Sequence, residues 1–218
     1  MFDESKSYKY VMFDCDGVIL NSNGLKSRAF FNVACPYSID AAKELVAYNK
    51  KFGGVSRSAK FDYFLKQILP KYTKNLPDIS DLLKNFGDLV KEGLLNCELN
   101  EDIFAVCSKL KNSEFSVISG GDQTELRDVF NLRGLTNYFG AGIWGSPETK
   151  YEIIERNFSH VSPSDCLFIG DSKLDFEVAR DFGFDFLFMS AWTEVDNWEE
   201  FVQRNAITHC VSLGNVFK

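Results

Sequence analysis

One stretch determines how this sequence is interpreted: Tyr10-Val11-Met12-Phe13-Asp14-Cys15-Asp16-Gly17-Val18-Ile19-Leu20. A short apolar run ends in two carboxylates and a glycine, which is typical of a strand buried on both faces and followed by a turn. Side chains alternate along an extended chain, so Asp14 and Asp16 should leave the strand end on the same side, with Cys15 pointing into the core. Two carboxylates beside a buried strand need a cation or a proton, unless the stretch is only a solvated turn.

The composition indicates a soluble globular protein and argues against two classes of partner. The 218 residues suffice for one large domain, or for a core domain with a smaller insert. A net charge of -7 and a pI near 5.0 argue against nucleic acid or an anionic membrane as the main partner. No apolar stretch approaches the roughly 20 residues of a membrane-spanning helix. The segment Met1–Ser7 has no apolar signal core, so we expect a cytoplasmic protein. Six cysteines without a Cys-x-x-Cys pair predict neither a zinc site nor a disulfide framework.

The middle of the first half reads as helical. Breaks at glycine and proline residues separate the expected helices, and no convincing strand occurs among them. The block therefore predicts a small helical bundle inserted into another domain. The expected helices are Leu25–Ala34, Ile39–Lys51, Ser56–Leu69 and Ile79–Leu95.

From about residue 100 the pattern alternates between helix and strand. Such alternation predicts an α/β fold, a doubly wound parallel sheet with helices on both faces. The segment 192–218 receives no assignment; it either adds a strand or covers a sheet edge. The expected strands are Phe115–Ile118, Gly142–Trp144, Cys166–Ile169 and Phe186–Met189.

Polar residues follow three of the expected strands. Ligands of a doubly wound sheet bind beyond the carboxyl ends of its strands. One crevice should therefore be surrounded by the polar ends of three strands, with Lys150 beside it. These ends are the carboxylates after Phe13, the stretch Ser119-Gly120-Gly121 and the stretch Gly170–Asp175. Carboxylates suit Mg²⁺, and glycine amides, a hydroxyl and an ammonium suit phosphate oxygens.

Two of these residues also have structural interpretations, and a third has a competitor. Ser119 could cap the helix that begins near Asp122. Asp175 could be an ordinary acidic residue at a helix N-terminus. Lys173 competes with Lys150 for the place beside the phosphate.

The chain resembles the haloacid dehalogenase-like hydrolase superfamily, in its phosphoglycolate phosphatase and β-phosphoglucomutase-like branch. The stretch from Asp14 to Ser22 resembles the first motif of the family, and Ser119 with Gly120 resembles the second. Lys150 resembles the third motif, although Tyr151 follows it where many members have proline. Gly170–Asp175 resembles the fourth motif.

The resemblance implies a domain organisation and roles for the site residues. Residues 21–97 would form a helical cap domain, and residues 1–20 and 98–218 a Rossmann-like core domain. Asp14 would be the nucleophile that forms an aspartyl-phosphate, and Asp16 the acid and base, protonated while Asp14 is ionised. The metal Mg²⁺ would be held by Asp14, the backbone carbonyl of Asp16 and Asp171, with Asp175 in support. Ser119, Gly120 and Lys150 would bind the phosphate.

Substrate choice would lie in the cap, in the loop Phe52-Gly53-Gly54-Val55-Ser56-Arg57. We expect Gly54 to give this loop freedom and Arg57 to contact the leaving group; the alternative is an interhelical turn with a solvated arginine. The cap would open and close about the linkers Asn21–Gly24 and Asn96–Asn100.

The sequence therefore predicts a magnesium-dependent phosphatase of a small phosphorylated metabolite, such as a sugar phosphate or a phosphoglycolate-like compound. A phosphomutase of the β-phosphoglucomutase kind shares the same motifs. A phosphate-binding protein without turnover is the third interpretation, and the intact pair Asp14 and Asp16 disfavours it. The oligomeric state is not predicted.

Overall fold

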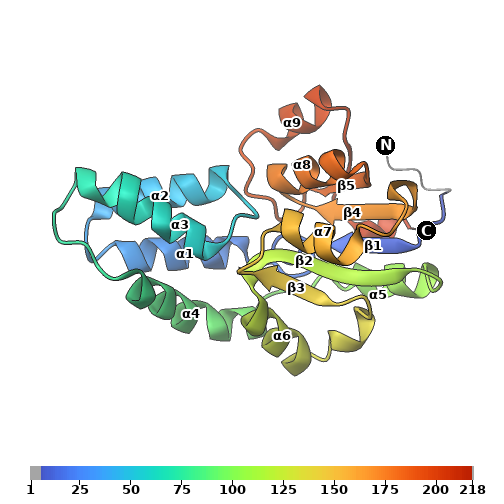
Figure 1. Ribbon diagram of the computed structural model, residues 1–218, viewed down its shortest axis with the longest axis horizontal. Coiled ribbons are helices and arrows are strands. Elements are labelled where there is room, and N and C mark those ends of the chain that lie inside the picture. Colours follow the sequence, from blue (N-terminus) through green and yellow to red (C-terminus); the bar gives the residue numbers. More distant parts are fainter. Residues whose placement is uncertain (1–5, 218) are drawn as a thin grey trace.

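A computed structural model describes residues 6–217 and shows an open parallel sheet in the order β3-β2-β1-β4-β5-β6 (Figure 1). Every neighbouring pair of strands is parallel. The predicted doubly wound α/β fold is confirmed. The strands are β1 (Tyr10–Phe13), β2 (Glu114–Asp122), β3 (Ile143–Ser146), β4 (Cys166–Gly170), β5 (Asp185–Met189) and β6 (Thr208–Cys210).

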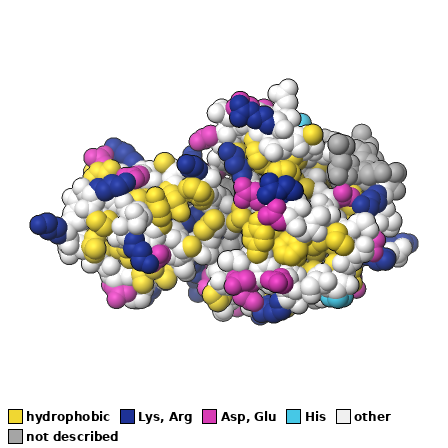
Figure 2. Space-filling view, turned by 45° about the horizontal axis from the view of Figure 1, so that its top comes forward, with side chains coloured by type: hydrophobic (Ala, Val, Ile, Leu, Met, Phe, Trp, Pro, Cys, Tyr) yellow, Lys and Arg dark blue, Asp and Glu magenta, His cyan; other side chains and the backbone are white. Residues whose placement is uncertain are grey.

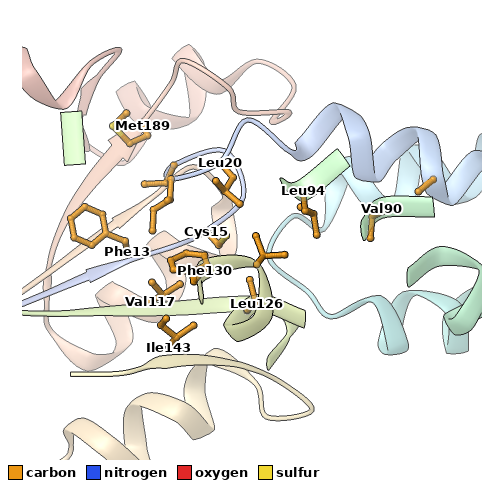
Figure 3. Packing of buried hydrophobic residues seen from close by; sticks show 14 of the residues in the cluster. Phe13, Cys15, Leu20, Val90, Leu94, Val117, Leu126, Phe130, Ile143 and Met189 are labelled. Atoms are coloured by element: carbon orange, nitrogen blue, oxygen red, sulfur yellow. The ribbon is translucent and has the colours of Figure 1, made fainter. Parts of the chain in front are cut away.

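Both faces of the sheet are buried, as the apolar first strand predicts. Val11, Phe13 and Cys15 belong to one hydrophobic cluster, and Met12 between them belongs to a second cluster across the sheet. Figure 3 shows Phe13 and Cys15 among other buried side chains of the first cluster. Cys15 thus points into the core, as predicted. The α-helices after residue 100 are α5 (Asp102–Lys109), α6 (Gln123–Leu132), α7 (Lys150–Phe158), α8 (Lys173–Phe182) and α9 (Trp198–Arg204).

A group of helices lies between β1 and β2 in the sequence and beside the sheet in space (Figure 1). Figure 2 shows it as a smaller lobe joined to the larger one at a narrower waist. The boundaries at residues 21 and 97 stay a prediction, and residues 1–5 and 218 of the predicted core domain lie outside the described residues. The helices of this lobe are α1 (Asn23–Ala34), α2 (Ile39–Lys51), α3 (Arg57–Tyr63) and α4 (Ile79–Asn96).

The predicted helix Ser56–Leu69 is α-helical only in its first part. Ser56 does cap α3, because its side chain accepts a hydrogen bond from the amide of Ala59. The α-helix ends at Tyr63 and continues as a π-helical turn, η1 (Phe64–Ile68), and a 3₁₀ turn, η2 (Leu69–Lys71). Pro70 lies in η2 and lacks the amide hydrogen that a continuing helix would need.

Two linkers join the helical lobe to the sheet and run side by side. The backbone amide of Asn21 donates to the carbonyl of Glu98 at 2.9 Å, and the Asn21 side chain donates to the Glu98 carboxylate at 3.0 Å. The amide of Asn100 donates to the carbonyl of Ile19 at 2.9 Å. Because both connections between the lobes lie at the same place, this place suits a hinge about which one lobe rotates against the other.

Two parts of the sheet differ from the sequence-based expectation. Strand β2 does not end at Ile118 but continues to Asp122, which is in register with Ser146 after an irregularity in the ladder. Strand β6 in the unassigned C-terminal segment pairs with β5 and forms an edge of the sheet.

Two findings bear on the composition. Within residues 6–217, no helix combines the length and the apolar character that crossing a bilayer requires. All six cysteines are free thiols, in agreement with the prediction of no disulfide framework.

The helical lobe has an aromatic core that can be tested by mutation. The ring of Phe61 lies 5.1 Å from that of Phe30 and 5.8 Å from that of Phe86, measured between centroids. We expect Phe61→Ala to lower the free energy of unfolding by about 3–5 kcal/mol, because it leaves a cavity. Leu89→Ala, at a position that is 47% exposed on α4, should change it by less than about 0.5 kcal/mol. Urea denaturation measures both variants, and equal losses would contradict this packing.

Candidate active site

Three buried carboxylates meet at the carboxyl ends of β1 and β4. Asp14 follows β1, Asp171 follows β4, and Asp175 lies in the first turn of α8. One carboxylate oxygen from each lies within 4.8 Å of the other two. The sequence placed all three residues at one crevice, and the structure brings them together.

Gly17 permits this approach. Its φ is +79°, a conformation that side-chain-bearing residues rarely adopt. A Cβ atom at this position would also overlap the Asp171 carboxylate. Glycine is therefore required at position 17 for two reasons: the backbone conformation, and the lack of space for a side chain beside Asp171.

Lys150 bridges two of the carboxylates. Its ammonium nitrogen lies 3.0 Å from Asp14 Oδ1 and 2.5 Å from Asp175 Oδ1, and its side chain is buried. It is the first residue of α7, which begins with a capping box at Thr149. Lys173 instead is exposed, and its ammonium lies over the ring of Phe201. The structure therefore brings Lys150 to the site and not Lys173.

Asp175 has two structural tasks. Its Oδ2 accepts hydrogen bonds from the amide and the hydroxyl of Ser172, at 3.0 and 2.7 Å, which closes the capping box of α8. Its Oδ1 accepts from Lys150. The alternative of an acid at a helix N-terminus is thus correct in part, since the same side chain also holds Lys150.

The site carries more negative charge than Lys150 compensates. Burial raises the pKa of Asp14 to about 7, and the neighbouring Asp175 and Asp16 raise it too, against the effect of Lys150. Burial and the charge of Asp14 raise the pKa of Asp171 well above its usual value. Closely spaced hard oxygen donors with excess negative charge are what Mg²⁺ binds, so the donor set fits this ion.

Asp16 has a different environment from Asp14. Its carboxylate accepts from the hydroxyl of Ser22 at 2.5 Å and forms an ion pair with Lys26 at 2.6 Å. Burial alone would raise the pKa of Asp16, but Lys26 and Ser22 together lower it. We expected Asp16 to be protonated and Asp14 to be ionised. The pKa shifts run in the opposite direction, because Lys26 on α1 stabilises the charged form of Asp16, whereas burial disfavours the charged form of Asp14.

Lys26 was missed by the sequence analysis. Its position offered one signal: a cation near the N-terminus of a helix opposes the helix dipole and needs another reason to be there.

The second motif forms the end of β2. Ser119 is fully buried, and its hydroxyl accepts from the amide of Gly121 at 3.0 Å. The side chain of Asp122 caps α6 by accepting from the amide of Glu125 at 3.0 Å, so the alternative role of Ser119 as this cap was wrong. Gly120 and Gly121 line the cavity described below.

The loop after α2 lies directly against this strand. A Cβ atom on Gly120 would overlap the carbonyl oxygen of Gly54. Gly54 has a φ of +80° and lies next to Ser172. The predicted cap loop therefore contacts two of the motifs, and glycine on both sides allows the close approach.

Arg57 reaches the same region but is engaged by the sheet lobe. Its guanidinium lies 2.9 Å from Glu125 and 3.6 Å from Asp122, and over the ring of Phe86. The alternative of a solvated arginine is wrong, since its side chain is 16% exposed. In this arrangement Arg57 ties the helical lobe to α6.

A cavity of about 70 Å³ lies between the two lobes. Its walls include Asp14, Asp16 and Asp171 from the sheet lobe and Arg57 from the helical lobe.

Side chains of two further segments support Asp171, and the sequence analysis missed both. Asn23 donates to Asp171 Oδ2 at 2.7 Å and to the carbonyl of Trp192 at 3.0 Å. Thr193 donates to the carbonyl of Asp171 at 2.6 Å. The loop after β5, in the segment without a sequence assignment, therefore completes the site.

The comparison with protein families agrees with this geometry. The model of the haloacid dehalogenase-like hydrolases matches residues 11–189. The chain belongs to this family. No curated protein matches the sequence.

Solved structures of the family show the same fold. A protein described as a predicted phosphatase from Clostridium acetobutylicum has a TM-score of 0.74 at 17% identity, covering 97% of each chain. β-Phosphoglucomutase from Clostridium difficile has a TM-score of 0.73 at 17% identity, covering 95% of this chain and 92% of its own. A hydrolase of this family from Bacillus subtilis, described as bound to magnesium and as revealing interdomain movement, has a TM-score of 0.63 at 18% identity, covering 93% and 100%. Identities this low show the fold alone.

Removing Lys150 should expose the cost of the buried carboxylates. Lys150→Met leaves Asp14 and Asp175 without their cation, so we expect the free energy of unfolding in metal-free buffer to fall by about 3–5 kcal/mol. Lys173→Met, the exposed control, should stay within about 0.5 kcal/mol of the parent. Chemical denaturation gives both values. A Lys150→Met protein as stable as the control would refute the bridge.

Proposed function

We propose that this protein is a magnesium-dependent phosphatase that hydrolyses a small phosphorylated metabolite through an aspartyl-phosphate on Asp14. The observation that carries the proposal is the buried Asp14 carboxylate, held by Lys150 and close to Asp171 and Asp175 at the end of β1. Membership of a hydrolase family and the fold of a phosphatase neighbour support it. The acidic net charge disfavours nucleic acid as a partner, and the six free cysteines suit a reducing, cytoplasmic location.

Asp14 attacks phosphorus in this proposal. Its Oδ1 accepts from Lys150 and from the amide of Cys15 at 2.7 Å, which fixes the carboxylate and leaves Oδ2 toward the phosphoryl group. The amide of Gly120 and the hydroxyl of Ser119, which the amide of Gly121 orients, would hold the phosphate oxygens, and Lys150 would compensate their charge.

Asp16 transfers the protons. While paired with Lys26 it is an ionised base, ready to take a proton from the water that hydrolyses the aspartyl-phosphate. The first step needs Asp16 protonated, to supply the leaving oxygen. Because Lys26 lies on α1 of the helical lobe, opening of this lobe would remove the cation and allow Asp16 to bind that proton.

Asp14, Asp171 and the backbone carbonyl of Asp16 would hold Mg²⁺, and Asp175 would support them through Lys150. The ion would neutralise phosphoryl charge during transfer. The magnesium described for the Bacillus subtilis relative supports this assignment.

Cap movement belongs to the same proposal. Entry of a metabolite requires the lobes to separate, since the cavity between them is small. The paired linkers at Asn21 and Glu98 would be the hinge, and the interdomain movement described for the same relative supports it.

A phosphomutase is the second candidate. The position of the cavity between the lobes favours it, because closing the cap over the site would exclude water and let the phosphoryl group return to substrate. The β-phosphoglucomutase neighbour has the same fold.

The first test is phosphate release from a panel of phosphorylated metabolites, with Mg²⁺ and with EDTA. We expect release only with Mg²⁺, and a fall on the order of a thousandfold or more for Asp14→Asn, because the nucleophile is lost. Asp40→Asn, at an exposed carboxylate, serves as the control and should leave the rate unchanged.

Release that persists in EDTA or in Asp14→Asn would refute this mechanism. Conversion of a hexose 1-phosphate to its isomer without phosphate release would establish the mutase instead.

The role of Arg57 has its own test. If Arg57 contacts the leaving group, Arg57→Ala raises KM for the best substrate by about tenfold and leaves KM for a generic aryl phosphate nearly unchanged. If Arg57 only ties the lobes together through Glu125, then Arg57→Ala changes KM equally for both substrates, and Glu125→Gln has the same effect as Arg57→Ala. Steady-state kinetics of the two variants distinguish these outcomes.

A further inference from the structure

Lys60 is a buried cation that the proposed mechanism does not use. It lies on α3 of the helical lobe, is 5% exposed, and lines the same cavity as Asp14 and Asp16. Its ammonium donates to the side-chain oxygen of Asn49 at 2.6 Å and lies 5.6 Å from the ring centroid of Phe30.

No carboxylate forms an ion pair with Lys60 in the part of the chain that the structure describes. A buried ammonium without an anion is costly, so such a group is uncommon unless a ligand completes it. Burial and the nearby Lys26 lower the pKa of Lys60 to about 7, although the charges of Asp16, Glu194 and Asp14 act in the opposite direction.

A chain of hydrogen bonds fixes Lys60 in place. The amide of Asn49 donates to Ser27 at 3.0 Å, and the hydroxyl of Ser27 donates to Glu194 at 2.6 Å. Asn49 and Ser27 are both buried. Two neutral side chains thus lie between Lys60 and Glu194, which orients the ammonium without an ion pair.

We infer that Lys60 binds an anionic group on the leaving part of the substrate. The substrate class is then a short phosphate ester that carries a second negative charge, a carboxylate or a second phosphate. This inference rests on the proposed function, in which the first phosphate lies at Asp14. The cavity of about 70 Å³ favours a short leaving group.

The test measures binding separately from turnover. The probes are two matched pairs: 2-phosphoglycolate against 2-hydroxyethyl phosphate, and propane-1,3-diol bisphosphate against its monophosphate. Dissociation constants are measured by calorimetry with Mg²⁺, on Asp14→Asn protein with and without Lys60→Met. Lys66→Met, on the exposed surface of the same lobe, is the control. The parent protein is assayed in parallel for hydrolysis of all four probes.

We expect at least one anionic probe to bind about 10- to 100-fold more tightly than its neutral twin, the range of a hydrogen bond to a charged group. Lys60→Met should abolish this difference and Lys66→Met should keep it. The pair that shows the difference identifies a carboxylate or a phosphate as the second anion. If Lys60 has only a structural role, Lys60→Met should weaken the binding of both members of each pair equally and lower the Tm of the protein.

Equal affinities within both pairs, a preference that survives Lys60→Met, or no binding of any probe would each overturn the inference. If the parent hydrolyses the probes without such a preference, the phosphatase proposal stands and the subsite fails. If the preference is present but the parent hydrolyses nothing, the subsite stands and the phosphatase proposal fails.

Discussion

The ion pairs of Lys150 with Asp14 and Asp175 hold the site together. Each of the three residues comes from a different element: the end of β1, the start of α7 and the start of α8. Breaking a buried ion pair is strongly destabilising, so the positions of these elements depend on one another. The capping boxes at Thr149 and Ser172 fix both helix starts, and thereby place the charges.

Close backbone contact is the second constraint, and it ties the helical lobe to the sheet. Gly54 and Gly120 meet without side chains, and Gly17 leaves room for Asp171. A side chain at either Gly17 or Gly120 would separate parts that must touch. Figure 2 shows the waist between the lobes. Arg57 of the helical lobe and Glu125 of the sheet lobe form an ion pair between the two lobes.

The sequence predicted the parts of the site that lie at strand ends. Asp14 and Asp171 were found because apolar runs followed by polar residues identify the carboxyl edge of a parallel sheet. Lys150 was found because it opens a helix after a loop with glycine and proline. Lys26, Asn23 and Thr193 were not found, because no local pattern shows which distant side chain a helix or a loop places against that edge. Strand β2 was cut short for a related reason: Ser119 and two glycines look like a turn, yet pairing with β3 keeps them in the strand.

The charges of the two lobes explain why closure and substrate binding would be coupled. The sheet lobe contributes Asp14, Asp16, Asp171 and Asp175, with Lys150 as the cation among them. The helical lobe brings Lys26, Arg57 and Lys60 to the same cavity. A phosphate ester on the sheet side adds negative charge, so it strengthens the attraction of these cations and favours the closed arrangement. Lys60 forms no ion pair within the described residues. Its ammonium is therefore stabilised most by a substrate that carries a second anionic group.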